Sequence, residues 1–202
     1  MIFRFLVLLI IPITFYAQSA DDIIDKVQKK FDQIDNLKAN FSQTIFSNQS
    51  MESLKFEGEF YYKKEDSFNI SLPNRKIISD GKSVWNYDEN EKKVVISEAE
   101  FDEASFSLKE IIYTYPEKCD LSLVESEPGI SYIKAIPKAL ELNFKEVFLT
   151  INDKYLLSKV EIVDFNNMKF IFELFSIKLN QNISDELFIF IPSDEVEIID
   201  LR

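Results

Sequence analysis

The side chains that could perform catalysis are few in this sequence. Its 202 residues include no histidine and one cysteine, Cys119. The lack of histidine excludes Ser-His-Asp and Cys-His catalysis and zinc chemistry, because these need histidine as general base or ligand. Paired carboxylates remain, at Asp102 with Glu103 and at Glu65 with Asp66, but adjacent surface acids are usually solvated charges. We therefore expect no catalytic residues, no metal site and no cofactor, and interpret the chain as a binding protein.

The composition points to a β-rich fold with much aromatic surface to bury. The chain contains 19 Phe and 8 Tyr but only 3 Gly, and aromatic residues favour strands. Either a Phe-rich core or an apolar cavity with broad walls would account for this bias. Lys and Arg total 23 against 35 Asp and Glu, a net charge of −12. This charge disfavours nucleic acid and anionic lipid surfaces as partners, although solubility alone would also explain it.

The first residues have the pattern of a cleavable secretory signal. An apolar run over residues 5–16 follows Arg4 and precedes the small-residue stretch 17–20. Cleavage after Ser19 fits best, and cleavage after Ala17 is the alternative. The run is shorter than the roughly 20 residues that a membrane-spanning helix needs. We expect residues 1–19 to be removed and the product to be exported.

The remainder of the chain is predicted to be one soluble domain, residues 20–202. Cys119 is too distant from the signal to carry a lipid anchor, and one cysteine cannot form an internal disulfide. A hydrophobic core must therefore hold the fold together. We expect a periplasmic monomer that does not insert stably into a membrane.

Periodicity predicts one amphipathic helix at the start of this domain. Over residues 21–35, apolar side chains recur with helical spacing at Ile23, Ile24, Val27, Phe31 and Ile34. Between residues 98 and 117, helical spacing returns over a shorter stretch. We expect one or two short helices there, inserted between strands.

Most of the remaining sequence alternates with the period of two that marks strands. Residues 54–63 show it most clearly, since Phe56, Phe60 and Tyr62 share one face and charged residues occupy much of the other. Further strands are predicted at residues 37–41, 67–72, 76–79, 83–87, 93–97, 121–125, 131–136, 141–151, 156–164, 169–179 and 186–191. The fold class is thus mainly β with a helical lid (α+β), an incomplete antiparallel β-barrel or strongly curved sheet covering a hydrophobic cavity.

Several ordered segments resemble the LolA family of outer-membrane lipoprotein carriers. They are Ala39-Asn-Phe-Ser-Gln-Thr44, Gly58-Glu-Phe-Tyr-Tyr-Lys-Lys64, Ser79-Asp-Gly-Lys-Ser-Val-Trp-Asn-Tyr87 and the closing Phe188-Ile-Phe-Ile-Pro192. The resemblance implies a periplasmic carrier that binds the acyl chains of lipoproteins released by an inner-membrane ABC transporter and delivers them to an outer-membrane acceptor. The alternatives are a generic periplasmic fatty-acid-binding or lipid-binding barrel, and an acceptor or envelope-sensor module like LolB.

The resemblance also assigns roles to residues. It implies an acyl-chain cavity walled by Phe41, Phe56, Phe60, Tyr62, Phe68, Ile70, Leu72 and Trp85. It implies a lid that contains Ile24, Val27, Phe31, Phe106, Leu108, Ile111 and Ile112. Where this family commonly has Arg-Pro, with the arginine latching the lid, this chain has Lys64-Glu65. Lys64 is therefore the candidate latch, although lysine lacks the planar fork of donors that arginine has.

Overall fold

A computed structural model describes residues 18–47, 53–99, 107–140 and 142–202. The predicted signal, apart from Gln18 and Ser19, lies outside the described residues, as does Phe106. Within the described ranges, no helix is long and apolar enough to cross a membrane.

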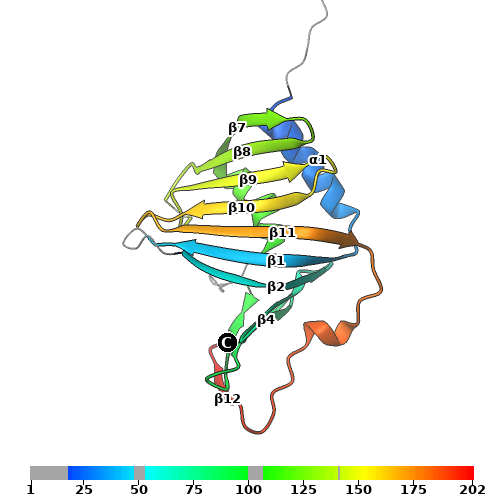
Figure 1. Ribbon diagram of the computed structural model, residues 1–202, viewed down its shortest axis with the longest axis vertical. Coiled ribbons are helices and arrows are strands. Elements are labelled where there is room, and N and C mark those ends of the chain that lie inside the picture. Colours follow the sequence, from blue (N-terminus) through cyan, green and yellow to red (C-terminus); the bar gives the residue numbers. More distant parts are fainter. Residues whose placement is uncertain (1–17, 48–52, 100–106, 141) are drawn as a thin grey trace, which may run out of the picture.

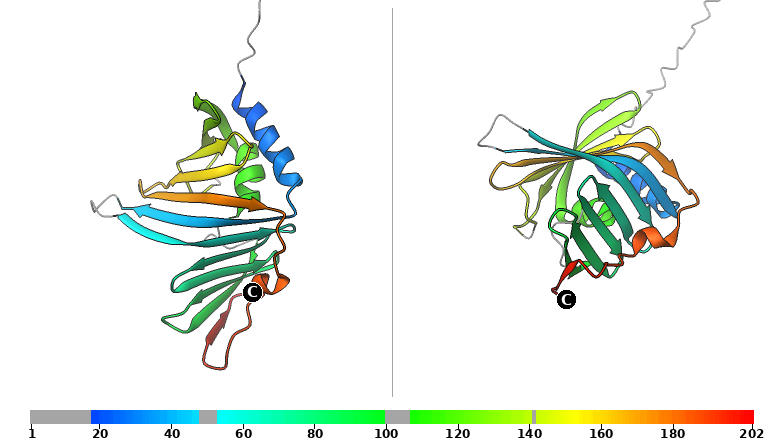
Figure 2. Two further views of the ribbon diagram at one scale, coloured as in Figure 1. Left: turned by 45° about the vertical axis from the view of Figure 1, so that its right-hand side comes forward. Right: turned by 60° about the horizontal axis from the view of Figure 1, so that its bottom comes forward.

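The described strands form one twelve-stranded sheet that is strongly curved and does not close (Figures 1 and 2). Its spatial order is β12-β6-β5-β4-β3-β2-β1-β11-β10-β9-β8-β7. The strands are β1 (Asn36–Phe46), β2 (Ser53–Lys63), β3 (Ser67–Leu72), β4 (Arg75–Asp80), β5 (Ser83–Asp88), β6 (Lys93–Glu98), β7 (Cys119–Glu127), β8 (Ile130–Pro137), β9 (Glu146–Asn152), β10 (Leu157–Val163), β11 (Lys169–Leu179) and β12 (Glu197–Asp200). The prediction of an incomplete, curved β-barrel is confirmed, and β12 departs from the antiparallel pattern by pairing parallel with β6.

The predicted N-terminal helix is α1 (Ala20–Asp32), and its start is fixed by a capping box. The Ser19 hydroxyl accepts a hydrogen bond from the Asp22 backbone N–H, and the Ser19 N–H donates to the Asp22 carboxylate, both at 3.1 Å. These bonds satisfy backbone donors that the first helical turn leaves unpaired. The apolar stripe of α1, including Val27 and Phe31, is buried.

The predicted insertion between β6 and β7 is helical where the structure describes it. A π-helical turn, η2 (Glu110–Thr114), continues into α2 (Tyr115–Lys118), with Pro116 inside its first turn. The insertion buries Leu108, Ile111 and Ile112 in the same core as α1 and the concave face of the sheet. Both helical segments therefore cover the inside of the curve (Figure 2).

The convex face of β3 to β6 has its own cover, which the sequence patterns do not predict. After β11 the chain passes over this face and forms the short 3-10 helix η3 (Asp185–Phe188). Phe188 is buried there, and the ring of Phe190 lies 5.1 Å from that of Tyr87. The predicted strand at residues 186–191 was therefore wrong: Phe188 and Phe190 pack onto the convex face without joining the sheet, and Ile189 and Ile191 are exposed.

Candidate functional site

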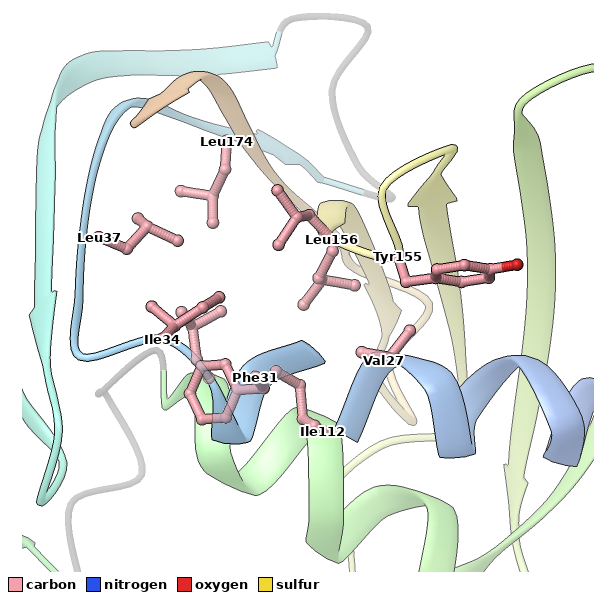
Figure 3. Close-up of a pocket in the computed structure, with 10 residues that line it drawn as sticks. Val27, Phe31, Ile34, Leu37, Ile112, Tyr155, Leu156 and Leu174 are labelled. Carbon is pink, nitrogen blue, oxygen red and sulfur yellow. The ribbon is translucent and has the colours of Figure 1, made fainter. Parts of the chain in front are cut away.

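A small apolar cavity lies between the two helical segments and the concave face of the sheet (Figure 3). It is lined by Val27, Phe31, Ile34, Leu37, Leu108, Ile112, Tyr155, Leu156, Leu157 and Leu174. Its volume is about 20 Å³, which is room for about one water molecule and far too little for an acyl chain. Side chains of α1 and the insertion thus fill most of the space inside the curve. We call these two segments, Ala20–Asp32 and residues 107–118, the lid.

Side-chain hydrogen bonds join the two parts of the lid to each other, and a further contact places Tyr113 Oη 3.5 Å from the backbone oxygen of Gln28. Gln28 Nε2 donates to the backbone oxygen of Ile112 at 3.0 Å, and Tyr113 Oη donates to Asp32 Oδ1 at 2.5 Å. Burial, and then the hydrogen bond to Asp32, raise the pKa of Tyr113 to about 12. We call the two shorter bonds, from Gln28 to Ile112 and from Tyr113 to Asp32, the clasp. Since the rest of the lid's packing here is apolar, the clasp is the directional part of its closure.

Five of the predicted wall residues lie together on the concave face beneath the lid. Phe41, Phe60, Tyr62, Phe68 and Ile70 are all buried in the common core, and Leu72 packs against it while partly buried. Their pairing explains the shared face, since Phe60 is directly opposite Ile70 and Tyr62 is directly opposite Phe68. The rings of Phe31 and Tyr62 are 4.9 Å apart, so the lid contacts this wall directly.

Two predicted wall residues lie elsewhere. Phe56 faces the same side of β2 as Phe60, but it is 40% exposed because the β1–β2 hairpin extends away from α1 (Figures 1 and 2). Trp85 lies on the opposite, convex face. Trp85 is paired with Ile78, and Ile78 is paired with Asn69. Because Asn69 lies between Phe68 and Ile70 in β3, it faces the opposite side of the sheet, and its paired residues face that side too. Trp85 is therefore not a wall residue, and this prediction needs correction.

The predicted lid residues are placed in the lid as described. Ile24, Val27, Phe31, Leu108, Ile111 and Ile112 are all buried in the common core. Four of them, Val27, Phe31, Leu108 and Ile112, line the cavity itself.

The side of the cavity formed by β10 and β11 was not among the predicted site residues. Leu174 could have been found, since it continues the alternation of Phe170 and Phe172 along β11. Tyr155 could not, because it belongs to a turn and has a left-handed φ of 57° that its sequence neighbours do not predict. Its ring lies 5.2 Å from Lys26 Nζ, so this turn also contacts α1.

The candidate latch, Lys64, binds beside the lid. Its Nζ lies 2.9 Å from Asp35 Oδ1, and its backbone N–H donates to the backbone oxygen of Asp35 at 3.0 Å. Asp35 follows α1 in the loop to β1, and both side chains are at least half exposed. The turn between β2 and β3, which contains Lys64 and Asp66, contacts the lid through a different ion pair: Asp66 Oδ2 lies 2.9 Å from Lys109 Nζ.

The site offers apolar surface and few groups able to do chemistry. Across the described residues, no three His, Cys, Asp or Glu side chains gather in a metal-binding arrangement. Cys119 is a buried free thiol, and burial raises its pKa. The arrangement is therefore suited to holding an apolar ligand by contact alone.

Comparison with known proteins gives one consistent result. The family described as outer membrane lipoprotein carrier protein LolA matches residues 32–191. An outer-membrane lipoprotein carrier protein of Francisella tularensis subsp. novicida is 26% identical over 189 residues, covering 92% of this chain and 89% of that protein. One of Nitrosomonas europaea is 25% identical over 171 residues, covering 80% and 81%. An uncharacterized conserved protein of Thermus thermophilus shares the fold, with a TM-score of 0.60 at 14% identity, covering 90% of this chain and 98% of that one.

Proposed function

Because this chain belongs to the LolA family of outer membrane lipoprotein carrier proteins, we propose that it takes lipoproteins from the inner membrane and delivers them to the outer membrane. It is a carrier and not an enzyme. The cargo's acyl chains would lie against the concave face of the sheet. The walls are Phe41, Phe60, Phe68 and Ile70, together with the β10–β11 residues that line the present cavity.

One observation carries this proposal: the concave face is apolar, and two helical segments of the lid cover it. In the closed state the lid side chains Val27, Phe31 and Ile112 occupy that face and leave only about 20 Å³ of free volume. An acyl chain would need the same surface. The lid and the cargo therefore compete for one site, which makes lid opening part of binding.

This competition suits a carrier that must release its cargo. Three acyl chains of about 16 carbons, at about 0.8 kcal/mol per buried CH₂, would gain about 38 kcal/mol on leaving water. Non-covalent affinities saturate near about 20 kcal/mol, so a site that realised most of this gain would not release its ligand. Displacement of the buried lid opposes binding and brings the net affinity into a range that allows transfer.

The route and the partners follow from this role. The pattern of residues 1–19 supports export into the periplasm. An inner-membrane ABC transporter would load the carrier, and an acceptor at the outer membrane would receive the cargo. Depletion of the protein should then leave lipoproteins in the inner-membrane fraction. An unchanged distribution of lipoproteins between the two membranes would contradict the delivery role.

A substitution on the wall tests the binding site. Phe68→Glu places a charge on the apolar concave face, and it should abolish binding of a fluorescent triacylated lipopeptide. Ser67→Glu is the matched control, because it adds the same charge one residue away on the convex face of β3. Wild-type affinity in both variants would place the acyl chains elsewhere on the protein.

A further inference from the structure

A second, polar pocket adjoins the apolar cavity and shares Phe31 with it. Its volume is about 250 Å³. It lies where the end of α1, the β2–β3 turn and the insertion meet, and it is lined by Phe31, Asp32, Tyr62, Lys64, Glu65, Asp66, Lys109 and Tyr113. A ligand on the concave face could therefore reach water through this pocket.

Most polar side chains around this pocket already have partners. Asp32 accepts from Tyr113, Asp66 pairs with Lys109, and Lys64 pairs with Asp35. Glu65 is an exposed carboxylate in the turn. Each of these groups is thus either paired or hydrated.

The hydroxyl of Tyr62 differs in being an uncharged donor that no described residue pairs with. Tyr62 is only 6% exposed, yet no described residue donates a hydrogen bond to its hydroxyl or accepts one from it, and the side chain borders the pocket. Among the described residues, no fully buried side-chain oxygen or nitrogen lacks a partner, so the Tyr62 hydroxyl is reached by water in the pocket. Burial also raises the pKa of Tyr62, which keeps the hydroxyl protonated and able to donate. A ligand with an acceptor oxygen could replace water on this donor.

We propose that the Tyr62 hydroxyl donates a hydrogen bond to an ester carbonyl of the diacylglyceryl group that joins acyl chains to a lipoprotein. This inference rests on the proposed function and deepens it. The ester groups lie at the boundary between the apolar chains and the polar polypeptide. The pocket has the same position in the protein, between the apolar cavity and solvent. Ester oxygens only accept hydrogen bonds, which matches the donor that Tyr62 leaves unused.

Lid opening would present this donor together with the apolar wall. Phe31 covers Tyr62, with ring centroids 4.9 Å apart. Tyr62 belongs to β2, next to the buried Phe60 on the same face, whereas Phe31 belongs to the lid. When α1 moves away, the ring and hydroxyl of Tyr62 become accessible at the same time. Chains and ester groups would then bind to adjacent parts of one strand.

A cycle that changes both partners tests the hydrogen bond. The probes are a synthetic lipopeptide with a dipalmitoyl-glyceryl cysteine and its dialkyl analogue, in which ether links replace both esters. The wild-type protein should bind the ester form about 3- to 10-fold more tightly, as expected for one hydrogen bond. In Tyr62→Phe the ester form should lose this advantage, so that both probes bind alike.

The controls separate a hydrogen bond from a loss of structure. Tyr132→Phe is the control, because it removes a hydroxyl from the face of β8 opposite the buried Ile133. This variant should keep the wild-type preference for the ester. Tyr62→Phe should unfold at about the wild-type temperature, since it breaks no hydrogen bond to a described residue. An unchanged ester preference in Tyr62→Phe, or no preference in the wild type, would overturn the inference while leaving the carrier role intact. A wild-type protein that binds neither probe would refute the carrier role and this inference together.

Discussion

Weakening the clasp should make the carrier hold its cargo more tightly. The double variant Gln28→Ala/Tyr113→Phe removes the bond to the Ile112 oxygen at 3.0 Å and the bond to Asp32 at 2.5 Å. The first is partly buried and is worth about 1 kcal/mol. The second involves a carboxylate but lies near the surface, so about 1 kcal/mol is again a suitable value. Their loss destabilises the closed lid by about 2 kcal/mol.

This change in free energy converts into a change in affinity. If the open state is the minor one, about 2 kcal/mol raises its population about 30-fold, and the apparent Kd for cargo falls by the same factor. Most of the effect should appear as slower release, because variants of one binding site differ mainly in their dissociation rates. Each single variant should show about a fivefold effect.

The assay follows a labelled triacylated lipopeptide as it passes from the loaded protein to acceptor vesicles, with amide hydrogen exchange of α1 measured on the empty protein. Gln33→Ala is the control, because Gln33 is exposed at the end of α1 and lies outside the clasp. Faster exchange in α1 without tighter binding would show that lid and cargo do not compete. Unchanged exchange and unchanged release would show that the clasp does not hold the lid closed.

Three further predictions concern the ends of the lid and its titration. A chain that begins at Ala20 lacks the Ser19 cap. Loss of this cap should cost about 1 kcal/mol of stability and lower the melting temperature by about 2–4 °C relative to a chain that begins at Gln18. Equal melting temperatures would show that the capping box contributes nothing. The pKa of Tyr113 is raised from 10.0 to about 12, so its contribution is complete below about pH 10 and is lost as the pH rises towards about 12. Wild-type stability to urea should therefore fall more between about pH 9 and about pH 11.5 than that of Tyr113→Phe, with the other tyrosines common to both; equal falls would contradict this. Lys64→Leu breaks an exposed ion pair with Asp35 and should slow cargo transfer by less than about threefold, with Lys64→Arg near wild type; a much larger effect would make Lys64 the main latch.

Local patterns in the sequence were sufficient for most of the elements. The spacing of Val27 and Phe31 predicts α1, and the alternation through Phe60 and Tyr62 predicts a strand with one buried face. These predictions succeed because a helix or strand repeats its side-chain directions at a fixed period. The same periodicity placed Phe68 and Ile70 on a common face, where the structure has them.

Which surface covers each face was decided only by the tertiary structure. Trp85 and Phe68 both lie in alternating strands, but their faces are related through the register of β3, β4 and β5, which no single strand encodes. Phe56 shares the face of Phe60, yet the lid ends before it.

The same limit applies to the segments that contact each other across the chain. The partly buried Tyr155 contacts α1, more than a hundred residues earlier, and burial of Phe188 depends on the convex face of β3 and β4. Periodicity states which side chains point the same way. Which residues those side chains contact depends on how distant segments pair. That pairing is determined by the free energy of the whole packed chain and not by local preference.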